Sequence, residues 1–381
     1  MAARKKAVSE ETQRPGRGNI DVTFLVLVLL LLTFGLVMMF SASYAYAYYR
    51  MDDSFYYIKR QLLFAVGGLG VMIFLAYFDY RWWRKLALPV FAASILMLVV
   101  VLFMPERNGA KRWIELGPLT FQPSEIAKFA VILMFASMVA LYGGKMHSFR
   151  YGILPFAAVL GAVAALMVLE PHLSGTILIL SIGAVMMFVG GTDLKWFLLL
   201  LCVLVAAVGI VVLIPGVIEY AQSRFQYWLD PFSDAQGKGF QTIQSLLAIG
   251  SGGFMGLGLG NSRQKYLYIP EPQNDFVFSI VCEELGFVGA AIIVILFALL
   301  VWRGFVIAIR AKDKFGSMLA VGLTTQVGLQ ALLNIAVVTN TIPNTGISLP
   351  FFSYGGSALI MLLAQMGVVL SVSRQAALEK Q

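Results

Sequence analysis

The sequence is poor in charged residues, which make up 13% of its 381 positions, whereas soluble domains carry about 25%. Histidine and cysteine are also scarce, with two of each. Because Cys202 and Cys282 lie far apart within apolar stretches, we expect neither a disulfide framework nor a cysteine-based metal site. The net charge is +8, but no basic face interleaved with aromatic residues is present, so we expect no nucleic-acid partner.

Hydrophobic residues account for 59% of the chain, and its mean hydropathy is +0.82. They recur in ten stretches, each close to the roughly 20 residues that a membrane-spanning helix needs. The sequence therefore predicts an all-α, polytopic membrane protein with about ten transmembrane helices. The ten stretches are Val22–Phe40, Leu62–Phe78, Leu86–Phe103, Phe121–Tyr142, Gly152–Leu169, Leu173–Gly190, Leu194–Ile214, Phe276–Trp302, Gly316–Val338 and Tyr354–Val372.

The distribution of Lys and Arg predicts the orientation. Ten spans place both termini on the same side of the membrane, and the tails and loops on that side contain more Lys and Arg than those on the other side. Because cytoplasmic loops are rich in Lys and Arg, both termini are predicted to be cytoplasmic. Residues 1–20 then form a cytoplasmic tail, which we expect to be disordered, and residues 375–381 form a second one. The membrane domain is residues 21–374, with one long extracytoplasmic loop at 215–274, between the seventh and eighth helices.

Ionisable residues inside a span are costly, so each needs a reason. Glu125 and Lys128 lie three residues apart on the fourth span and can pair on one helical face. A structural ion pair and a contact with substrate are both consistent with this spacing, and both can hold at once. Glu283 and Glu284 lie deep in the eighth span, and at least one of them should face the protein interior.

Asp275 stands just before the eighth span, at its outer end. An Asp in this position is commonly an N-cap that accepts hydrogen bonds from free backbone N–H groups, and the sequence alone favours that interpretation. The alternative is a general base, because partial burial at the membrane boundary would raise the pKa of the carboxyl towards neutrality.

Other polar features also gather towards the outer side. Gln326, Gln330 and Asn334 form a stripe on the ninth span, which indicates either hydrogen bonds between helices or the wall of a polar cavity. The segment Asn340–Ser357 follows, rich in Pro, Gly and hydroxyl groups; such a backbone at membrane depth must be packed in protein or line a cavity. The glycine-rich stretch Gly250–Gly260 lacks the features of a nucleotide loop and predicts a tight, re-entrant turn.

The segment Asn340–Ser357 resembles the signature of the SEDS family (shape, elongation, division and sporulation), whose members are peptidoglycan glycosyltransferases. The resemblance covers about Asp21 to Arg374 and leans towards the FtsW and SpoVE branches, which act in division and sporulation. One departure lies between the fifth and sixth spans, where many members have an Asp and this chain has His172. The other matching motifs, in the family's order, are Gly109–Ile114, Gln122–Glu125 with Lys128, Gly239–Gln241 with Gln244 and Ser245, and Pro270–Glu271 with Asp275 and Phe276.

This resemblance implies that the chain polymerises lipid II into glycan strands at the outer face of the bacterial cytoplasmic membrane. Asp275 matches the family's essential Asp and is assigned as the base that deprotonates the acceptor GlcNAc 4-hydroxyl, which attacks C1 of the donor MurNAc as undecaprenyl pyrophosphate leaves. A divalent cation, Mg²⁺ or Mn²⁺, would be shared with the substrate pyrophosphate, because no dedicated metal site is visible. The candidate substrate-binding residues are Glu125, Lys128, Arg112, Lys111, Arg263, Lys265, Thr345, Ser353 and Ser357. Among them, Arg112, Arg263 and Lys265 are candidates for phosphate contacts, because of their positive charge and their place on the outer side.

The implied partners are lipid II, a class B penicillin-binding protein with transpeptidase activity, and other membrane proteins of the divisome or elongasome. Two other functions stay open, a lipid II flippase and a scaffold for a transpeptidase. Because most polar residues within the spans lie in their outer halves, polymerisation is favoured over transport. We expect Glu125, Lys128, Asp275 and the segment Asn340–Ser357 to converge on one cavity that opens at the outer leaflet.

Overall fold

The computed structural model describes residues 18–105, 111–116, 119–170, 172–199, 226–237 and 239–376. Within these residues, nine helices are long and apolar enough to cross a membrane, in agreement with nine of the ten expected spans. The remaining expected span, Leu194–Ile214, starts in residues 194–199, which are helical, and continues outside the described residues. Cys202 and most of both predicted tails also lie outside them.

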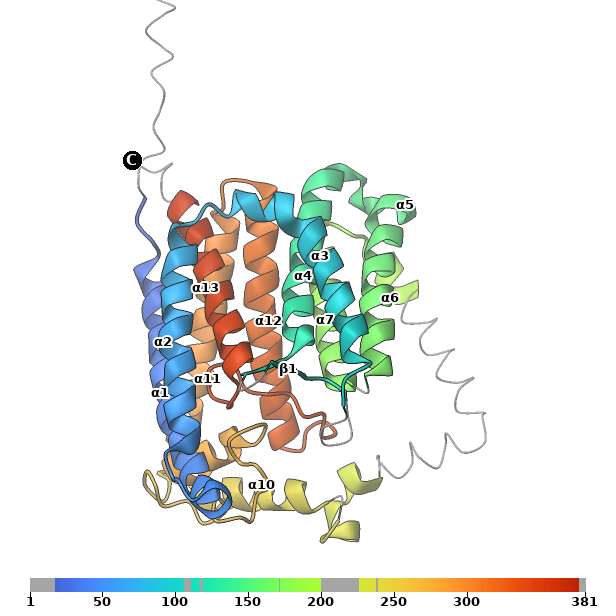
Figure 1. Ribbon diagram of the computed structural model, residues 1–381. Coiled ribbons are helices and arrows are strands. Elements are labelled where there is room, and N and C mark those ends of the chain that lie inside the picture. Colours follow the sequence, from blue (N-terminus) through green and yellow to red (C-terminus); the bar gives the residue numbers. More distant parts are fainter. Residues whose placement is uncertain are drawn as a thin grey trace, which may run out of the picture.

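The spanning helices stand side by side in a bundle (Figure 1). Apolar residues cover most of each helix, because the outer helices face lipid and the inner ones face one another. The helices are α1 (Val22–Met51), α2 (Tyr56–Tyr77), α3 (Arg81–Val101), α4 (Pro123–Tyr142), α6 (Leu154–Leu169) with the short α5 (Phe149–Gly152) before it, α7 (Leu173–Gly190), α11 (Val277–Ile309), α12 (Lys314–Val338) and α13 (Gly356–Ala376).

Helices α4 and α12 form the centre of the bundle, and both bury most of their side chains. Helix α4 packs against α3, α7 and α12, while α2 packs along the length of α13. Gly322 allows the close approach at the centre, because a Cβ there would lie 2.6 Å from Cγ2 of Ile132 on α4. Small residues at such crossings are typical of helices that associate in membranes, where van der Waals packing replaces the hydrophobic effect.

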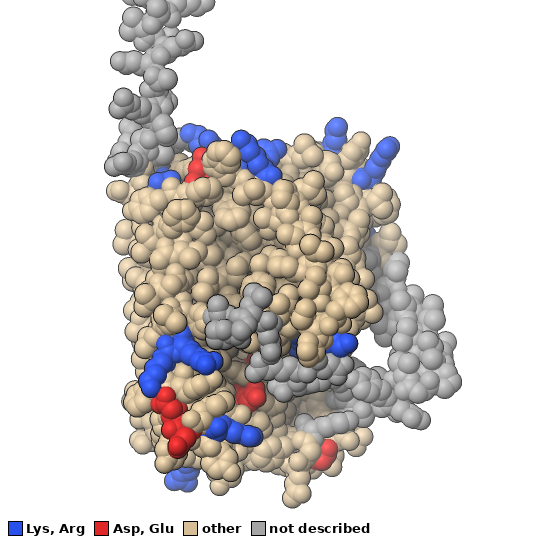
Figure 2. All heavy atoms as spheres, viewed as in Figure 1, with Lys and Arg blue, Asp and Glu red and all other residues tan. Residues whose placement is uncertain are grey.

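Both described chain ends lie at the same end of the bundle. The backbone N–H of Asp21 donates to Oγ of Ser373, 3.1 Å away, which joins the start of α1 to the last turn of α13. On the face seen in Figure 2, Lys and Arg gather at this end, and a broad band without charged side chains separates it from the opposite end. This distribution agrees with cytoplasmic termini and places the opposite end outside.

The extracytoplasmic end is built from the long connections. Helix α10 (Phe240–Gly252) lies across the ends of the spanning helices in Figure 1, after the short 3-10 helix η2 (Pro231–Asp234). Strands β1 (Ile114–Leu116) and β2 (Leu119–Phe121) pair antiparallel, a small hairpin that hydropathy does not predict.

Residues 253–260 of the glycine-rich stretch turn back onto the start of α11, as the sequence predicts, whereas Gly250 and Gly252 belong to the end of α10. Re-entry of this turn into the membrane stays a prediction. The backbone N–H groups of Leu257 and Gly258 donate to the carbonyl oxygens of Glu283 and Glu284, each over 3.0 Å. Helix α11 kinks at Gly286, whose φ of 65° is readily adopted only by glycine. A Cβ on Gly286 would also lie 2.2 Å from the backbone nitrogen of Gly256, so this contact requires glycine for a second reason.

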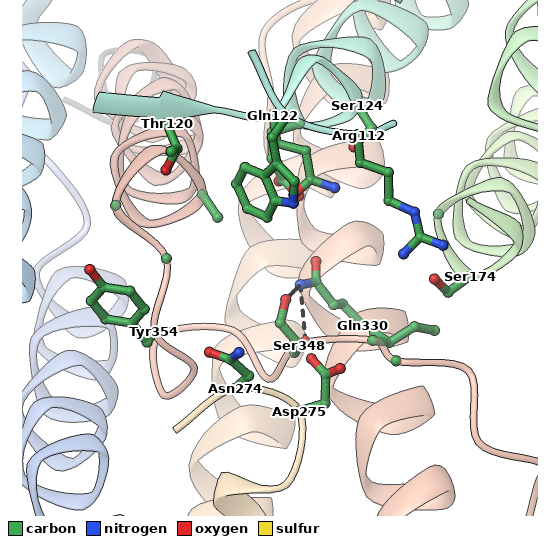
Figure 3. Close-up of a pocket in the computed structure, with 18 of the residues that line it drawn as sticks. Arg112, Thr120, Gln122, Ser124, Ser174, Asn274, Asp275, Gln330, Ser348 and Tyr354 are labelled. Atoms are coloured by element: carbon green, nitrogen blue, oxygen red, sulfur yellow. Dashed lines mark hydrogen bonds between the residues drawn. The ribbon is translucent and has the colours of Figure 1, made fainter. Parts of the chain in front are cut away.

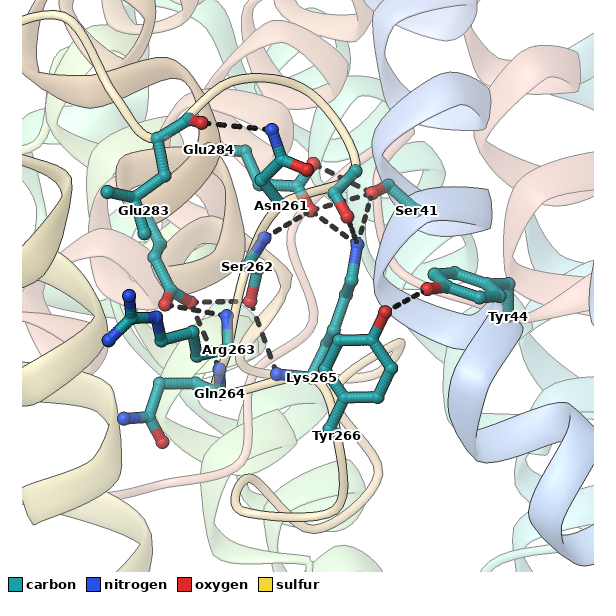
Figure 4. A network of polar contacts seen from close by, with 12 residues as sticks. Ser41, Tyr44, Asn261, Ser262, Arg263, Gln264, Lys265, Tyr266, Glu283 and Glu284 are labelled. Atoms are coloured by element: carbon teal, nitrogen blue, oxygen red, sulfur yellow. Dashed lines mark hydrogen bonds and ion pairs between the residues drawn. The ribbon is translucent and has the colours of Figure 1, made fainter.

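Glu283 and Glu284 are both buried, which confirms that this part of α11 faces the interior. Lys265 pairs with Glu284 (Nζ to Oε1, 2.8 Å) and also donates to the carbonyl oxygen of Gly260 over 2.6 Å. Ser41 on α1 donates to the same Glu284 carboxylate. Figure 4 shows how these groups join α1, α11 and the loop between α10 and α11, since each element contributes at least one of them.

Candidate functional site

A cavity of about 600 Å³ opens at the extracytoplasmic end of the bundle. Its wall is formed by parts of the chain that are distant in sequence: the start of α2, the hairpin, the first turns of α4 and α7, residues 271–275, α12 and residues 346–356. Glu125, Lys128, Asp275 and part of the segment Asn340–Ser357 all line it. The expectation that these groups converge on one cavity is therefore confirmed.

Asp275 is not the N-cap of α11, contrary to the interpretation that the sequence favours. The N-cap is Phe276, and it makes no side-chain capping bond. Residues 271–276 form turns, which bring the Asp275 side chain to the cavity wall instead of the free N–H groups of α11. The Asp275 backbone is fixed by Asn334, whose Nδ2 donates to the carbonyl oxygens of Asp275 (2.7 Å) and Ile347 (2.6 Å).

The environment of Asp275 makes its carboxyl a weaker acid than that of an ordinary Asp. Burial raises its pKa to about 6, the negative charge of Glu271 acts in the same direction, and the positive charge of Arg112 opposes both. At neutral pH most of these carboxyls are still deprotonated. Asp275 can therefore accept a proton, and it holds that proton more strongly than an ordinary Asp does.

Glu125 and Lys128 form an ion pair of 2.8 Å in the first two turns of α4. Only 5% of the Lys128 side chain is exposed, and both residues line the cavity. The structural and the substrate-facing interpretations therefore do not exclude each other, because the pair neutralises two charges within a span and still faces the cavity.

The polar stripe on α12 also combines its two interpretations. Nε2 of Gln330 donates to the backbone oxygen and to Oγ of Ser348, each over 3.1 Å, and both residues line the cavity (Figure 3). Asn334 donates to the backbone of Asp275, which lines the cavity, and Gln326 lines a smaller pocket beside the cavity. The stripe thus holds the segment after α12 in place and contributes polar groups to the cavity wall.

Positive charge gathers on the side of the cavity formed by the hairpin, α4 and α7. Arg112 precedes β1, and in Figure 3 its guanidinium extends towards Ser174 at the start of α7. Burial lowers the pKa of the Arg112 guanidinium, while the charges of Asp275 and Glu170 counter that effect. Trp113 also lines the cavity.

Two predicted phosphate contacts lie elsewhere. Lys265 is 0% exposed, and its ammonium group is occupied by Glu284, Gly260 and Ser41, so the prediction that it contacts substrate is wrong. Arg263 is exposed on the loop between α10 and α11 and does not line the cavity. The positive charge of each residue and its side of the membrane suggested both contacts, but Lys265 is paired with the buried carboxylate of Glu284.

The remaining candidates lie beside the cavity. Lys111 and Thr345 precede cavity-lining residues in the chain without lining it themselves, and Ser357 lies between two residues that do. Ser353 has a structural contact, since its Oγ accepts from the N–H of Leu349 and donates to the carbonyl oxygen of Asn274, each over 2.7 Å. Any substrate contact of these four residues stays a prediction.

Several cavity residues were not predicted from the sequence. Tyr57 and Arg60 lie one turn apart on α2 and line the cavity, and the Tyr57 ring contacts that of Tyr354 at 4.9 Å between centroids. His172 and Ser174 line it from the start of α7. The spacing of Tyr57 and Arg60 places an aromatic and a cationic side chain on one face at the end of a helix, which could have indicated a binding site. Such pairs are also common as membrane anchors, so the spacing alone does not identify cavity residues.

Within the described part of the chain, no group of three or more His, Cys, Asp or Glu residues could hold a metal ion. A divalent cation held mainly by substrate phosphates would need only one or two protein carboxylates. Asp275 and Glu271 both line the cavity, and neither is in an ion pair with another described side chain. The sharing of Mg²⁺ or Mn²⁺ with substrate therefore stays a prediction.

Comparisons with known proteins agree with this architecture. The FtsW/RodA/SpoVE family model, described as cell cycle protein, matches residues 22–378. Stage V sporulation protein E of Bacillus subtilis is 43% identical, and the match covers 86% of this chain and 89% of that protein. The probable peptidoglycan glycosyltransferase FtsW of Geobacter sp. (strain M18) is 40% identical, with 85% of this chain and 88% of that protein covered.

Two solved structures share the fold. A chain from a peptidoglycan synthase complex, solved in work on the coordination of polymerization and crosslinking, superposes with a TM-score of 0.78 at 32% identity. That match covers 94% of this chain and 98% of the other. The rod shape determining protein RodA of Thermus thermophilus gives a TM-score of 0.68 at 29% identity, with 93% and 97% covered.

Proposed function

The chain belongs to the FtsW/RodA/SpoVE family and is a multi-pass peptidoglycan glycosyltransferase of the bacterial cytoplasmic membrane, and from this premise we propose that it polymerises lipid II with Asp275 as the general base. The observation that carries the proposal is the Asp275 carboxylate in the wall of a polar cavity, at the bundle end opposite to both termini. No ion pair neutralises this carboxylate among the described residues, so it is available to accept a proton.

The proposed reaction proceeds in one displacement. The Asp275 carboxylate takes the proton from the 4-hydroxyl of the acceptor GlcNAc, and that oxygen forms a bond to C1 of the donor MurNAc. The bond between C1 and the pyrophosphate oxygen breaks, and undecaprenyl pyrophosphate leaves with the bonding electrons. Asp275 then releases its proton to water, which restores the base.

The charges around the cavity suit this substrate. Arg112 provides planar donors that match phosphate oxygens, and Lys128 adds a second positive charge, although Glu125 holds it. A divalent cation bound to the pyrophosphate would add further charge neutralisation. Exposed apolar side chains on the outer helices face the lipid in which the polyprenyl chain is dissolved.

Partners are proposed on the same basis. A relative of similar fold is part of a peptidoglycan synthase complex, which is consistent with a penicillin-binding protein partner for this chain. We propose that this partner is a class B transpeptidase, and that other membrane proteins of the divisome or elongasome bind as well. Scaffolding of the transpeptidase and polymerisation can coexist, because the cavity occupies only one part of the extracytoplasmic end.

The substrate assignment is tested with the purified full-length protein, its cognate transpeptidase, lipid II and Mg²⁺ or Mn²⁺. We expect glycan strands to form, and they can be resolved by gel electrophoresis of fluorescently labelled lipid II. A transbilayer assay in proteoliposomes measures flipping in the same preparation. Lipid II transport without any glycan strands would overturn the proposal in favour of the flippase.

The pH profile provides a separate prediction. Because Asp275 must be deprotonated to act, the polymerisation rate should fall as the pH drops through about 6, by tenfold for each further unit. Glu271 raises the pKa of Asp275, so Glu271→Gln should move this acid limb to lower pH. Gln can still accept the hydrogen bond that Asn274 Nδ2 donates to Glu271, so the variant changes mainly the charge.

The control for this prediction is Asp230→Asn, which removes an exposed carboxylate at the same end of the protein that does not line the cavity. Its rate should follow the wild-type pH profile. A Glu271→Gln profile that moves to higher pH, or that coincides with the Asp230→Asn profile, would show that Asp275 does not set the acid limb.

A further inference from the structure

Two helices begin at the same side of the cavity. Ser124 lies in the first turn of α4, and Ser174 and Gly175 lie in the first turn of α7; all three line the cavity. Neither N-cap residue, Gln122 or His172, makes a side-chain bond to the free N–H groups of its helix. Both helix ends therefore direct partial positive charge to this side. Unused N–H donors come mainly from α7, because α4 begins at Pro123, which has no N–H, and the N–H of Glu125 donates to the carbonyl oxygen of Gln122.

Buried polar atoms at the same place also lack partners. The Ser124 side chain is 2% exposed and His172 is 9% exposed, and neither Oγ of Ser124 nor Nδ1 of His172 has a hydrogen-bond partner among the described residues. Buried polar atoms are nearly always paired, so two orphans in one cavity wall indicate a ligand that supplies the partners.

The electrostatic environment selects the charge of that ligand. Burial and the positive charges of Arg112 and Lys128 lower the pKa of His172 to about 3, so its imidazole is neutral in the cell and donates one N–H. The nearby carboxyl groups offset the positive charges of Arg112 and Lys128 only in part. Glu125 is held by Lys128, and burial raises the pKa of Glu170 to about 7.

We propose that Ser124, His172 and the first turn of α7 form a subsite, here called the α7 subsite, for the pyrophosphate of the lipid-linked sugar donor. The inference rests on the proposed function and deepens it, because it assigns one side of the cavity to the leaving group and leaves Asp275 for the acceptor. A diphosphate suits the α7 subsite better than a single carboxylate does, since the first turn of α7 and two orphan side chains offer donors to several oxygens at once.

Gly175 gives the subsite a second test that removes no polar group. A Cβ at this position would lie 2.7 Å from Cε1 and 2.9 Å from Nδ1 of His172. The absence of a side chain at Gly175 therefore provides the space in which the His172 imidazole lies. Gly175→Ala should displace the ring and weaken anion binding, although Ala is otherwise well tolerated in a helix.

The chain contains only two histidines, which makes binding directly observable by NMR. His147 lies at the cytoplasmic end and pairs with Asp193 (Nδ1 to Oδ1, 2.6 Å), so it serves as an internal control, and His147→Gln assigns the signals. The full-length protein, labelled at histidine and embedded in phosphatidylcholine nanodiscs, is titrated with inorganic pyrophosphate and with a short-chain polyprenyl pyrophosphate.

Both ligands should shift the His172 imidazole resonance and leave that of His147 in place. Ser124→Ala should weaken the binding about tenfold, which corresponds to the loss of one hydrogen bond to a charged group. Ser94→Ala is the matched control, because this serine is also buried but lies on α3 and does not line the cavity. An unchanged His147 resonance in each variant shows that the protein remains folded.

The other outcomes separate the alternatives. A His172 shift caused by phosphatidylglycerol in the nanodisc, without pyrophosphate, would identify a membrane headgroup as the occupant and overturn the proposal. An unchanged His172 resonance at saturating pyrophosphate would overturn it too. The titration is repeated with Asp275→Asn, in which binding should persist, so that a failure of the subsite is distinct from a failure of the proposed base.

Discussion

Asp275→Asn is expected to lower the rate of lipid II polymerisation by about a hundred- to ten-thousandfold, the range typical for loss of a general base. The amide has nearly the same shape as the carboxylate but cannot accept the proton of the acceptor hydroxyl at neutral pH. The backbone contact with Asn334 does not involve the side chain and should remain intact. The measurement is the yield of glycan strands from purified protein, partner, lipid II and divalent cation.

The design of this experiment separates catalysis from scaffolding. The variant should still insert into the membrane and bind its transpeptidase, as measured by co-purification. Asp53→Asn is the matched control, because Asp53 is an exposed acidic residue near the extracytoplasmic end that does not line the cavity. Polymerisation by Asp275→Asn at a rate close to that of Asp53→Asn would disprove the role of Asp275 as the base.

Lys265→Met is expected to lower the free energy of unfolding by about 3–5 kcal/mol, the cost of breaking a buried ion pair on one side. Both partners, Lys265 and Glu284, are 0% exposed. Met fills a similar volume but leaves the Glu284 carboxylate without its cation. The effect can be measured by equilibrium or thermal unfolding in detergent.

Two further variants make this stability prediction specific. The double variant with Lys265→Met and Glu284→Gln removes both charges and should recover part of the loss. Lys59→Met breaks an ion pair with Asp53 whose side chains are 66% and 39% exposed, so it should cost no more than about 1 kcal/mol. If Lys265→Met proves as mild as Lys59→Met, the buried pair does not hold α1, α11 and the loop together.

The contrast between Asp275 and Lys265 shows where sequence reasoning succeeds and where it fails. For Asp275 the family motif pointed to a residue that lies in the cavity wall, whereas the local pattern favoured an N-cap. The N-cap interpretation failed because turns at residues 271–276 rotate the side chain into the cavity. For Lys265, charge and side of the membrane suggested a phosphate contact, but the partner is Glu284, which is adjacent only in the folded chain.

The sequence by itself determined nine of the spans in the described residues, their orientation and the family. It could do so because hydrocarbon accepts only long apolar helices, and because Lys and Arg mark the cytoplasmic side. Only the tertiary structure decided which polar groups meet. Arg112, Glu125, His172 and Asp275 share one cavity because helix packing brings distant residues together. The pKa shifts of His172 and Asp275 follow from burial and from neighbouring charges that no local pattern specifies.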